Sequence, residues 1–274
     1  MTTAGHEALQ AGREALAAYA KRVKSSTLHK VASEMLSVKR TFADEPQLRR
    51  ALTDPARKAD DRAGLAEQLL SGKVSAGTLK VILTIVKGRW STPGEFLNAV
   101  EEVAVDALLT AGAADDVLAD VEDELFRFVR LVEGDDELYA ALNDSRADAS
   151  ARAGFVRTLL SDKANELTVR LTEVAAYGYG GRRFDAAVNR LVERAAEKRE
   201  ERVAYVTVAH PLPDAQESAL AQKLSQIYQQ PVHTMVTVDP EAIGGISVQI
   251  GHDLYDGTVA RRLTEARKAL TGRR

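Results

Sequence analysis

The chain has 274 residues, a formal net charge of −3, 45% hydrophobic and 5% aromatic residues, and no cysteine. This length allows two or three small domains, and the lack of cysteine excludes disulfides, thiolate nucleophiles and cysteine metal sites. A dedicated nucleic-acid binder needs a basic surplus for its phosphate contacts, which this composition does not provide. We therefore expect no nucleic-acid partner.

The sequence shows no signal for secretion or membrane insertion. A basic segment followed by an apolar one is missing at the N-terminus, and the longest apolar stretch, near Leu79 to Val86, is far shorter than the roughly 20 residues that span a bilayer. A reducing cytoplasm is the natural setting for a chain without cysteine. We expect contact with a membrane only indirectly, through partners.

An internal duplication is visible when the chain is aligned with itself at an offset of 90 residues. Seventeen of the fifty-one positions from 28 to 78 are then identical without a gap, where chance at this composition gives about four or five. The identical pairs include Glu34/Glu124, Asp54/Asp144, Arg62/Arg152, Gly64/Gly154 and Thr78/Thr168. The two halves are copies of one helical unit.

Apolar residues at helical spacing predict the same helices in each copy. The first copy is expected to form helices at about 25–44, 45–53 and 75–88, and the second copy at about 113–134, 135–143 and 165–178. The helix between the last two of each copy is indicated by an apolar stripe, which is Ala59, Ala63, Ala66 and Leu70 in one copy and Ala149, Ala153, Val156 and Leu160 in the other. A last pair begins at Thr92 and at Arg182. Thr92 and Glu95 are expected to form a capping box, with Pro93 at the first helical position.

Two further features concern helix ends. We expect Asp54 and Asp144 to stand at N-caps, with Pro55 at the first helical position of the next helix. The run from Gly178 to Arg183 follows a helix and lacks the third glycine of a phosphate loop, so it predicts a helix C-cap and a bend.

After residue 200 the pattern changes from helical spacing to alternation. Strands are expected at 203–208, 232–238 and 246–250. A helix between the first two is expected to face inward through Leu220, Leu224, Ile227 and Tyr228, and a terminal amphipathic helix is expected from Thr258.

These elements predict an α+β chain that is mostly α: two tandem helical bundles followed by a small C-terminal α/β domain. The expected domains are residues 1–105 for the first bundle, 106–200 for the second bundle, and 201–274 for the α/β domain.

The sequence contains no arrangement typical of an active site. The five histidines, His6, His29, His210, His233 and His252, lack the spacing of metal ligands, and a lone histidine is far more often a surface or core residue. No nucleophile, base and oxyanion donor set is apparent, and neither a P-loop nor a dinucleotide fingerprint is present. We expect no catalytic residue, no metal and no cofactor.

The C-terminal segment resembles the signature of the delta subunit of F-type ATP synthase, the family of the oligomycin-sensitivity-conferring protein. The positions that match the signature are Val238, Asp239, Ile243, Gly244, Gly245, Asp256, Gly257, Thr258 and Arg262. One position departs, because the family favours a larger aliphatic residue than Ala242. The alternative for Gly244 and Gly245 is a purely structural role, because glycine allows a positive φ or a close approach of the backbone.

The resemblance implies a structural role in an F-type ATP synthase. It covers the second bundle and the C-terminal domain, so the first bundle is an additional copy. By resemblance, the chain is a non-catalytic connector of the peripheral stalk, or stator, at the cytoplasmic face of the cell membrane. Its helical part would hold the N-terminal helices of the head's α subunits, and its C-terminal domain would hold the b stalk helices. The alternative is a helical adaptor unrelated to ATP synthase.

Overall fold

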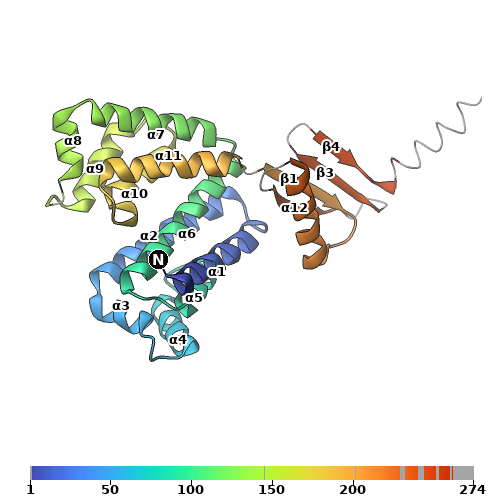
Figure 1. The fold of residues 1–274 in the computed structure, drawn as a ribbon, viewed down its shortest axis with the longest axis horizontal. Coiled ribbons are helices and arrows are strands. Elements are labelled where there is room, and N and C mark those ends of the chain that lie inside the picture. Colours follow the sequence, from blue (N-terminus) through green and yellow to red (C-terminus); the bar gives the residue numbers. More distant parts are fainter. Residues whose placement is uncertain are drawn as a thin grey trace, which may run out of the picture. The chain divides into compact units, whose positions relative to one another are not determined.

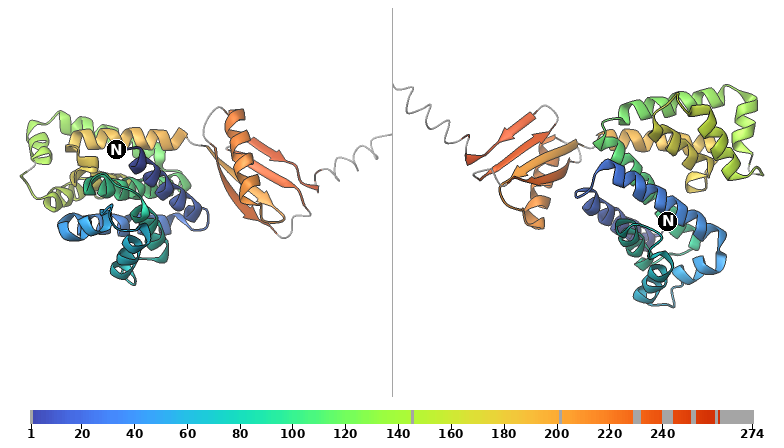
Figure 2. Two further views of the ribbon diagram at one scale, coloured as in Figure 1. Left: turned by 60° about the horizontal axis from the view of Figure 1, so that its bottom comes forward. Right: turned by 180° about the vertical axis from the view of Figure 1, so that it is seen from behind.

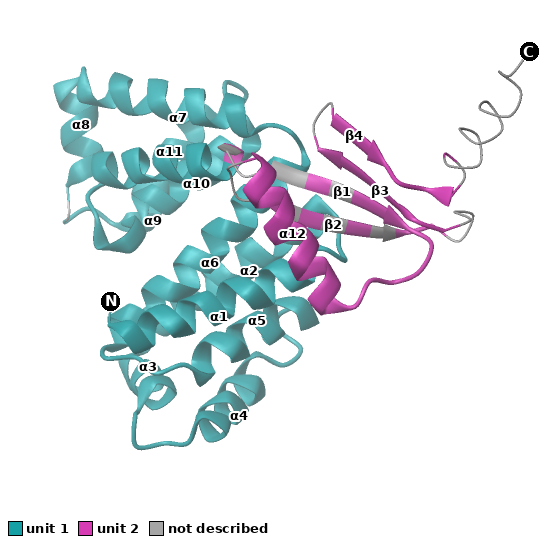
Figure 3. Ribbon diagram, turned by 45° about the vertical axis from the view of Figure 1, so that its right-hand side comes forward, with its two compact units in different colours: residues 1–198 teal, residues 199–274 magenta. Residues whose placement is uncertain are grey.

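A computed structural model describes residues 2–144, 146–200, 202–228, 232–239, 244–250, 253–259 and 261. The chain divides into two compact units, residues 1–198 and 199–274 (Figure 3). The first unit is helical and the second contains the sheet. The predicted fold class, two tandem helical bundles followed by a small α/β domain, is confirmed.

The helical unit contains both copies of the duplication. The first copy comprises α1 (Thr3–Ala20), α2 (Ser25–Asp44), α3 (Pro46–Thr53), α4 (Ala59–Leu70), α5 (Ala76–Lys87) and α6 (Pro93–Ala114). The second copy continues with α7 (Leu118–Glu133), α8 (Asp136–Asn143), α9 (Ala149–Leu160), α10 (Glu166–Ala176), the short 3-10 turn η1 (Tyr179–Gly181) and α11 (Phe184–Glu200). Figure 1 shows the first set in blue to teal and the second in green to yellow.

Helix α6 belongs to both copies. At the offset of 90 residues it is the counterpart of α1, and the two helices begin at equivalent N-caps, Thr2 and Thr92. It is also the last helix of the first bundle, where it packs along α1 and α2. Thirteen of its 22 residues are buried, as expected of a helix that is covered on most sides. The predicted boundary between residues 105 and 106 falls inside this helix.

The second long helix starts later than its apolar pattern predicts. The expected range began near residue 113, but α6 continues to Ala114 and α7 begins only at Leu118. Between them Asp116 adopts a positive φ of 56°, which breaks the helical path. The apolar residues from 113 onward therefore belong partly to the end of one helix and partly to the start of the next.

One hydrogen-bonding arrangement occurs at equivalent positions in the two copies, 90 residues apart. The Oε2 atom of Glu34 accepts hydrogen bonds from the Ser75 N–H at 2.9 Å and the Thr78 hydroxyl at 2.5 Å. The Oε2 atom of Glu124 accepts the equivalent bonds, from Asn165 N–H at 2.9 Å and Thr168 Oγ1 at 2.5 Å. Each carboxylate thus connects the second helix of its copy to the start of the fifth. These helices are α2 and α5 in the first copy, and α7 and α10 in the second, where α6 counts as the first helix.

A second arrangement that occurs in both copies uses an arginine, buried in the first copy and half-buried in the second. Arg62 is 4% exposed and donates to the carbonyl oxygens of Arg57 at 2.7 Å and Gly88 at 2.8 Å. Its counterpart Arg152 donates to the carbonyl oxygens of Ala147 and Ala176, both at 3.1 Å. Because helix ends leave carbonyl groups unpaired, each arginine satisfies the end of the fifth helix and ties it to the loop before the fourth.

The prediction that Asp54 and Asp144 are N-caps is wrong. Each follows the short third helix of its copy and accepts a hydrogen bond from the N–H two residues on, at 2.9 Å from Ala56 and 2.9 Å from Arg146. Such Asx turns are a local alternative to capping. The next helices begin five residues later, at Ala59 and Ala149, so Pro55 lies in a turn.

The bend predicted at the glycine run from residue 178 is confirmed. Helix α10 ends at Ala176, Gly178 takes a left-handed φ of 83°, and η1 follows before α11. Glycine adopts this conformation without steric cost.

The described residues of the C-terminal unit form a four-stranded sheet with one helix. Its elements are β1 (Arg202–Val208), α12 (Asp214–Tyr228), β2 (Val232–Val238), β3 (Ile246–Ile250) and β4 (Asp253–Asp256). The strand order is β2-β1-β3-β4, with β1 and β2 parallel and the other pairs antiparallel. Figure 2 shows α12 lying across one face of the sheet.

The three predicted strands are confirmed, whereas β4 is a strand that the sequence pattern did not predict. Leu224 of α12 is buried against the sheet, and Leu220 and Tyr228 pack there in part. The prediction that Ile227 also faces inward is wrong, because its side chain is 66% exposed. Most of the predicted terminal helix lies outside the described residues.

A Glu34→Gln substitution tests the repeated carboxylate arrangement. Burial by itself raises the pKa of Glu34, but hydrogen bonds from Thr78 and Ser75 outweigh it and hold the pKa below its ordinary value of 4.5. The ionised carboxylate therefore stabilises the fold fully at pH values above 4.5, the ordinary pKa. This stabilisation is lost as the pH falls through the lowered pKa of the folded state. At pH 7 we expect the substitution to lower the free energy of unfolding by about 1–3 kcal/mol.

Urea denaturation at a series of pH values from 7 to 3 measures this effect, with Glu67→Gln on the exposed face of α4 as the control. The difference between the native chain and the Glu34 variant should shrink toward acid pH. A difference that is the same at all pH values would contradict the proposed role of the ionised carboxylate.

Candidate functional site

The described signature residues lie at one end of the sheet of the C-terminal unit. Val238 is the last residue of β2 and is 42% exposed. The N–H of Asp239 donates to the carbonyl oxygen of Val208 at 2.9 Å. Val208 pairs with Val238 on one side and with Ile246 on the other, so the segments before and after the glycine pair meet across β1.

The glycine pair is required by close backbone contact. Gly244 and Gly245 have φ values of 126° and 91°, which side chains disfavour. A Cβ atom at Gly245 would stand 2.6 Å from the carbonyl oxygen of Gly257 and 2.8 Å from Thr258 Cα. The carbonyl oxygen of Gly244 accepts a hydrogen bond from Val259 N–H at 3.0 Å. Both glycines therefore have a structural role: they allow a positive φ, and Gly245 also allows the close approach of the turn at Gly257.

The Asp256-Gly257-Thr258 turn packs against this pair. Asp256 Oδ1 accepts from the Thr258 N–H at 2.9 Å, and hydrogen bonds from Thr258 hold the pKa of the Asp256 carboxyl below its usual range. The Gly257 N–H donates to Ile246 O at 2.9 Å. Two parts of the signature that are eleven or more residues apart thus close one corner of the unit.

The remaining signature residues, Ile243 and Arg262, lie outside the described residues. Sequence reasoning identified the described members as a set, and the structure brings Gly244 and Gly245 together with Asp256, Gly257 and Thr258. Val238 and Asp239 lie at the same sheet end but two strands away. A partner-binding role of the signature stays a prediction.

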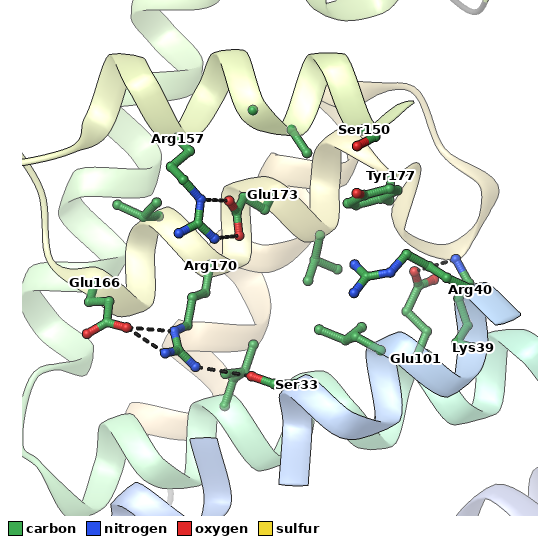
Figure 4. Close-up of a pocket in the computed structure, with 16 residues that line it drawn as sticks. Ser33, Lys39, Arg40, Glu101, Ser150, Arg157, Glu166, Arg170, Glu173 and Tyr177 are labelled. Atoms are coloured by element: carbon green, nitrogen blue, oxygen red, sulfur yellow. Dashed lines mark hydrogen bonds and ion pairs between the residues drawn. The ribbon is translucent and has the colours of Figure 1, made fainter. Parts of the chain in front are cut away.

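The helical unit contains a groove of about 450 Å³ between the two copies, which sequence reasoning missed. On one side it is lined by α2 and α6, and on the other by α9 and α10 (Figure 4). Apolar side chains from all four helices form part of its wall, namely Leu36, Leu108, Ala153, Val169 and Val174. No local pattern predicts it, because it depends on how helices 100 residues apart pack.

Charged residues at the groove are arranged in pairs. Arg157 binds Glu173 at 2.5 Å, and Arg170 binds Glu166 at 2.5 Å. These contacts raise the pKa of Arg157 and lower that of Glu166. The guanidinium of Arg40 instead lies over the ring of Tyr177, 4.9 Å from its centroid. Figure 4 shows these side chains around the groove rather than converging on one point.

This arrangement suits contact with another protein segment better than chemistry. Guanidinium and carboxylate groups that neutralise each other leave neither a general base nor an activated nucleophile. Within the described part of the chain, no three His, Cys, Asp or Glu side chains are placed to hold a metal ion. The lining mixes apolar with charged side chains, and an amphipathic helix presents both kinds of side chain to a groove of this kind.

A Gly245→Ala substitution tests the closure of the C-terminal corner. We expect it to destabilise the C-terminal unit by about 1–3 kcal/mol, because the added Cβ needs a positive φ and overlaps the turn at Gly257. Hydrogen exchange of β3 amides in the full chain measures the effect. The control is Gly64→Ala in α4, where a Cβ meets open space; that change should be neutral or stabilising. Unchanged exchange in the Gly245 variant would contradict the steric argument.

Comparison with known proteins connects both units to one family. A family model described as ATP synthase delta (OSCP) subunit matches residues 11–105 and again residues 100–270. The double match agrees with the internal duplication, and the two matched ranges overlap within α6.

Relatives extend this match over nearly the whole chain. A protein of Salinispora arenicola named ATP synthase subunit delta is 48% identical over 267 residues, which is 97% of each chain. A Streptomyces griseus protein of the same name is 42% identical and covers 99% of this chain and 100% of its own length. One of Thermobifida fusca is 37% identical over 87% of this chain and 89% of its own. The chain belongs to the ATP synthase delta (OSCP) subunit family.

Proposed function

We propose that this chain is the non-catalytic connector of the peripheral stalk in an F-type ATP synthase. The observation that carries the proposal is the full-length similarity to proteins named ATP synthase subunit delta. In a rotary enzyme the catalytic head must be held against the rotor, because a head that turns with it loses the torque. A connector needs binding surfaces and stiffness but no active site.

The proposed partners are the N-terminal helices of the α subunits, held by the helical unit, and the b stalk helices, held by the C-terminal unit. The groove between α2, α6, α9 and α10 supports the first assignment by its shape and lining. None of the described helices is long and apolar enough to cross a membrane. The similarity to proteins named ATP synthase subunit delta supports a place at the cytoplasmic face of the membrane, attached through the complex.

The duplication provides a second docking surface in this proposal. Leu36 of α2 lines the groove, whereas its counterpart in the second copy, Phe126 of α7, is 52% exposed. The face of the second helix that lines the groove in the first copy is thus exposed to solvent in the second copy. This exposure is expected where a series of repeated units ends. Two tethered sites of moderate strength can raise the overall affinity about 10²- to 10⁴-fold.

A pull-down from detergent-solubilised membranes tests the stator role. The tagged full-length chain should recover the α, β and b subunits in near-stoichiometric amounts, as identified by mass spectrometry. Recovery of other proteins without these subunits, from folded chain, would contradict the proposal and favour the alternative of an unrelated helical adaptor.

A matched pair of substitutions tests which copy holds the head. Gly154 on α9 lines the groove and Gly64 is its counterpart on α4; a Cβ at either position meets open space. Gly154→Trp places a large side chain at the groove without disturbing the helix core, and should weaken recovery of the α subunit. Gly64→Trp should do so only if the first copy holds a partner as well. If neither change affects recovery, docking on this face of the fourth helices is wrong.

A further inference from the structure

The shared helix α6 carries three acidic residues that are bound from both copies at once. Glu101 is 1% exposed. Its Oε1 atom pairs with Lys39 Nζ of α2 at 2.8 Å, while its Oε2 atom accepts the Gly180 N–H of η1 at 2.8 Å. One buried carboxylate therefore joins a helix of the first copy to the bend before the last helix of the second.

The next two acidic residues are shared in the same way. Glu102 Oε2 is 3.4 Å from Arg13 of α1 and 2.7 Å from Arg194 of α11. Asp106 binds Arg13 through Oδ2 at 2.8 Å and Arg194 through Oδ1. Two arginines, one from the first helix and one from the last helix of the unit, thus hold the same pair of carboxylates from opposite sides.

The acidic residues are specific to the shared helix. At the offset of 90 residues their counterparts in α1 are Ala11, Gly12 and Leu16, and their counterparts in α11 are Leu191, Val192 and Ala196. No charge is present at any of these six positions. The duplicated fold does not need the carboxylates within a single copy, since α1 and α11 pack without them.

Burying charge is costly unless it is paired, and the cost is greatest for Glu101, because the side chains of Glu102 and Asp106 are 19% and 18% exposed. Losing the donors of either copy would leave a carboxylate buried and undersatisfied. Movement of one copy relative to the other is opposed for this reason, beyond the resistance that apolar packing gives. The geometry of each ion pair also fixes the orientation of the donor helix.

We infer that Glu101, Glu102 and Asp106 are positioning residues that join the two helical copies into one rigid body. The extra copy is then an extension of constant geometry and not a flexibly attached module. This inference concerns the helical unit itself and holds whether or not the proposed stator role is correct.

The experiment measures the distance between the copies in the full chain. Because the native sequence has no cysteine, Glu67→Cys on α4 and Asp120→Cys on α7, both exposed, provide two unique sites for spin labels. Pulsed electron paramagnetic resonance should find one narrow distance population in the otherwise native chain. With Glu101→Gln, Glu102→Gln and Asp106→Asn combined, the narrow population should be lost while circular dichroism retains the helical content.

A control separates positioning from general stability. Glu124 is also bound by a backbone N–H and a threonine, but wholly within the second copy. Glu124→Gln should lower the urea midpoint and leave the distance population narrow. If it broadens the population as much as the triple substitution, or if the triple substitution leaves it narrow, the inference is wrong.

Should the triple variant fail to fold, Arg194→Met removes the second-copy donor from both Glu102 and Asp106 and leaves α6 intact. The same loss of the narrow population is expected, and its persistence would overturn the inference. Restoring the charge with Arg194→Lys should recover part of the narrow population, because a single ammonium can replace one of the two contacts.

Discussion

The helical unit depends on a constraint that acts on one helix. Because α6 is the last helix of the first bundle and the first helix of the second, it must be covered by both. Its sequence meets this need with apolar residues on most sides and with three carboxylates placed where donors from both copies reach them. A helix with one polar face exposed to water could not take this position.

The identities between the copies are explained by hydrogen-bonding requirements as much as by apolar packing. Glu34 and Glu124 accept hydrogen bonds from backbone N–H groups at the start of the fifth helix. Arg62 and Arg152 donate to carbonyl oxygens at its end. Such partners are hard to replace, because a buried polar group without a partner costs about 1–3 kcal/mol. Apolar positions tolerate exchange of side chains of similar size, as between Met35 and Leu125.

The C-terminal unit and the helical unit serve the proposed connector in different ways. In the C-terminal unit the family signature closes a corner of the fold, where Gly245 lies against the Gly257 turn with no room for a side chain. In the helical unit the surfaces that suit a partner are a groove and an exposed helix face. Apart from Val238, the described signature residues are thus not the ones that offer apolar surface, such as Phe126.

The sequence by itself determined the fold class, the duplication, most helix ranges and three of the four strands, because these follow from periodicity and from local rules for glycine and proline. It misplaced the start of α7 and the role of Asp54, where an Asx turn and an N-cap use the same residue type. The sharing of α6, the groove, and the contacts of Glu101 with Lys39 and Gly180 were decided only by tertiary structure. Contacts between residues 62 and 79 positions apart leave no local pattern, because they arise from the packing of whole helices and not from the spacing of neighbours.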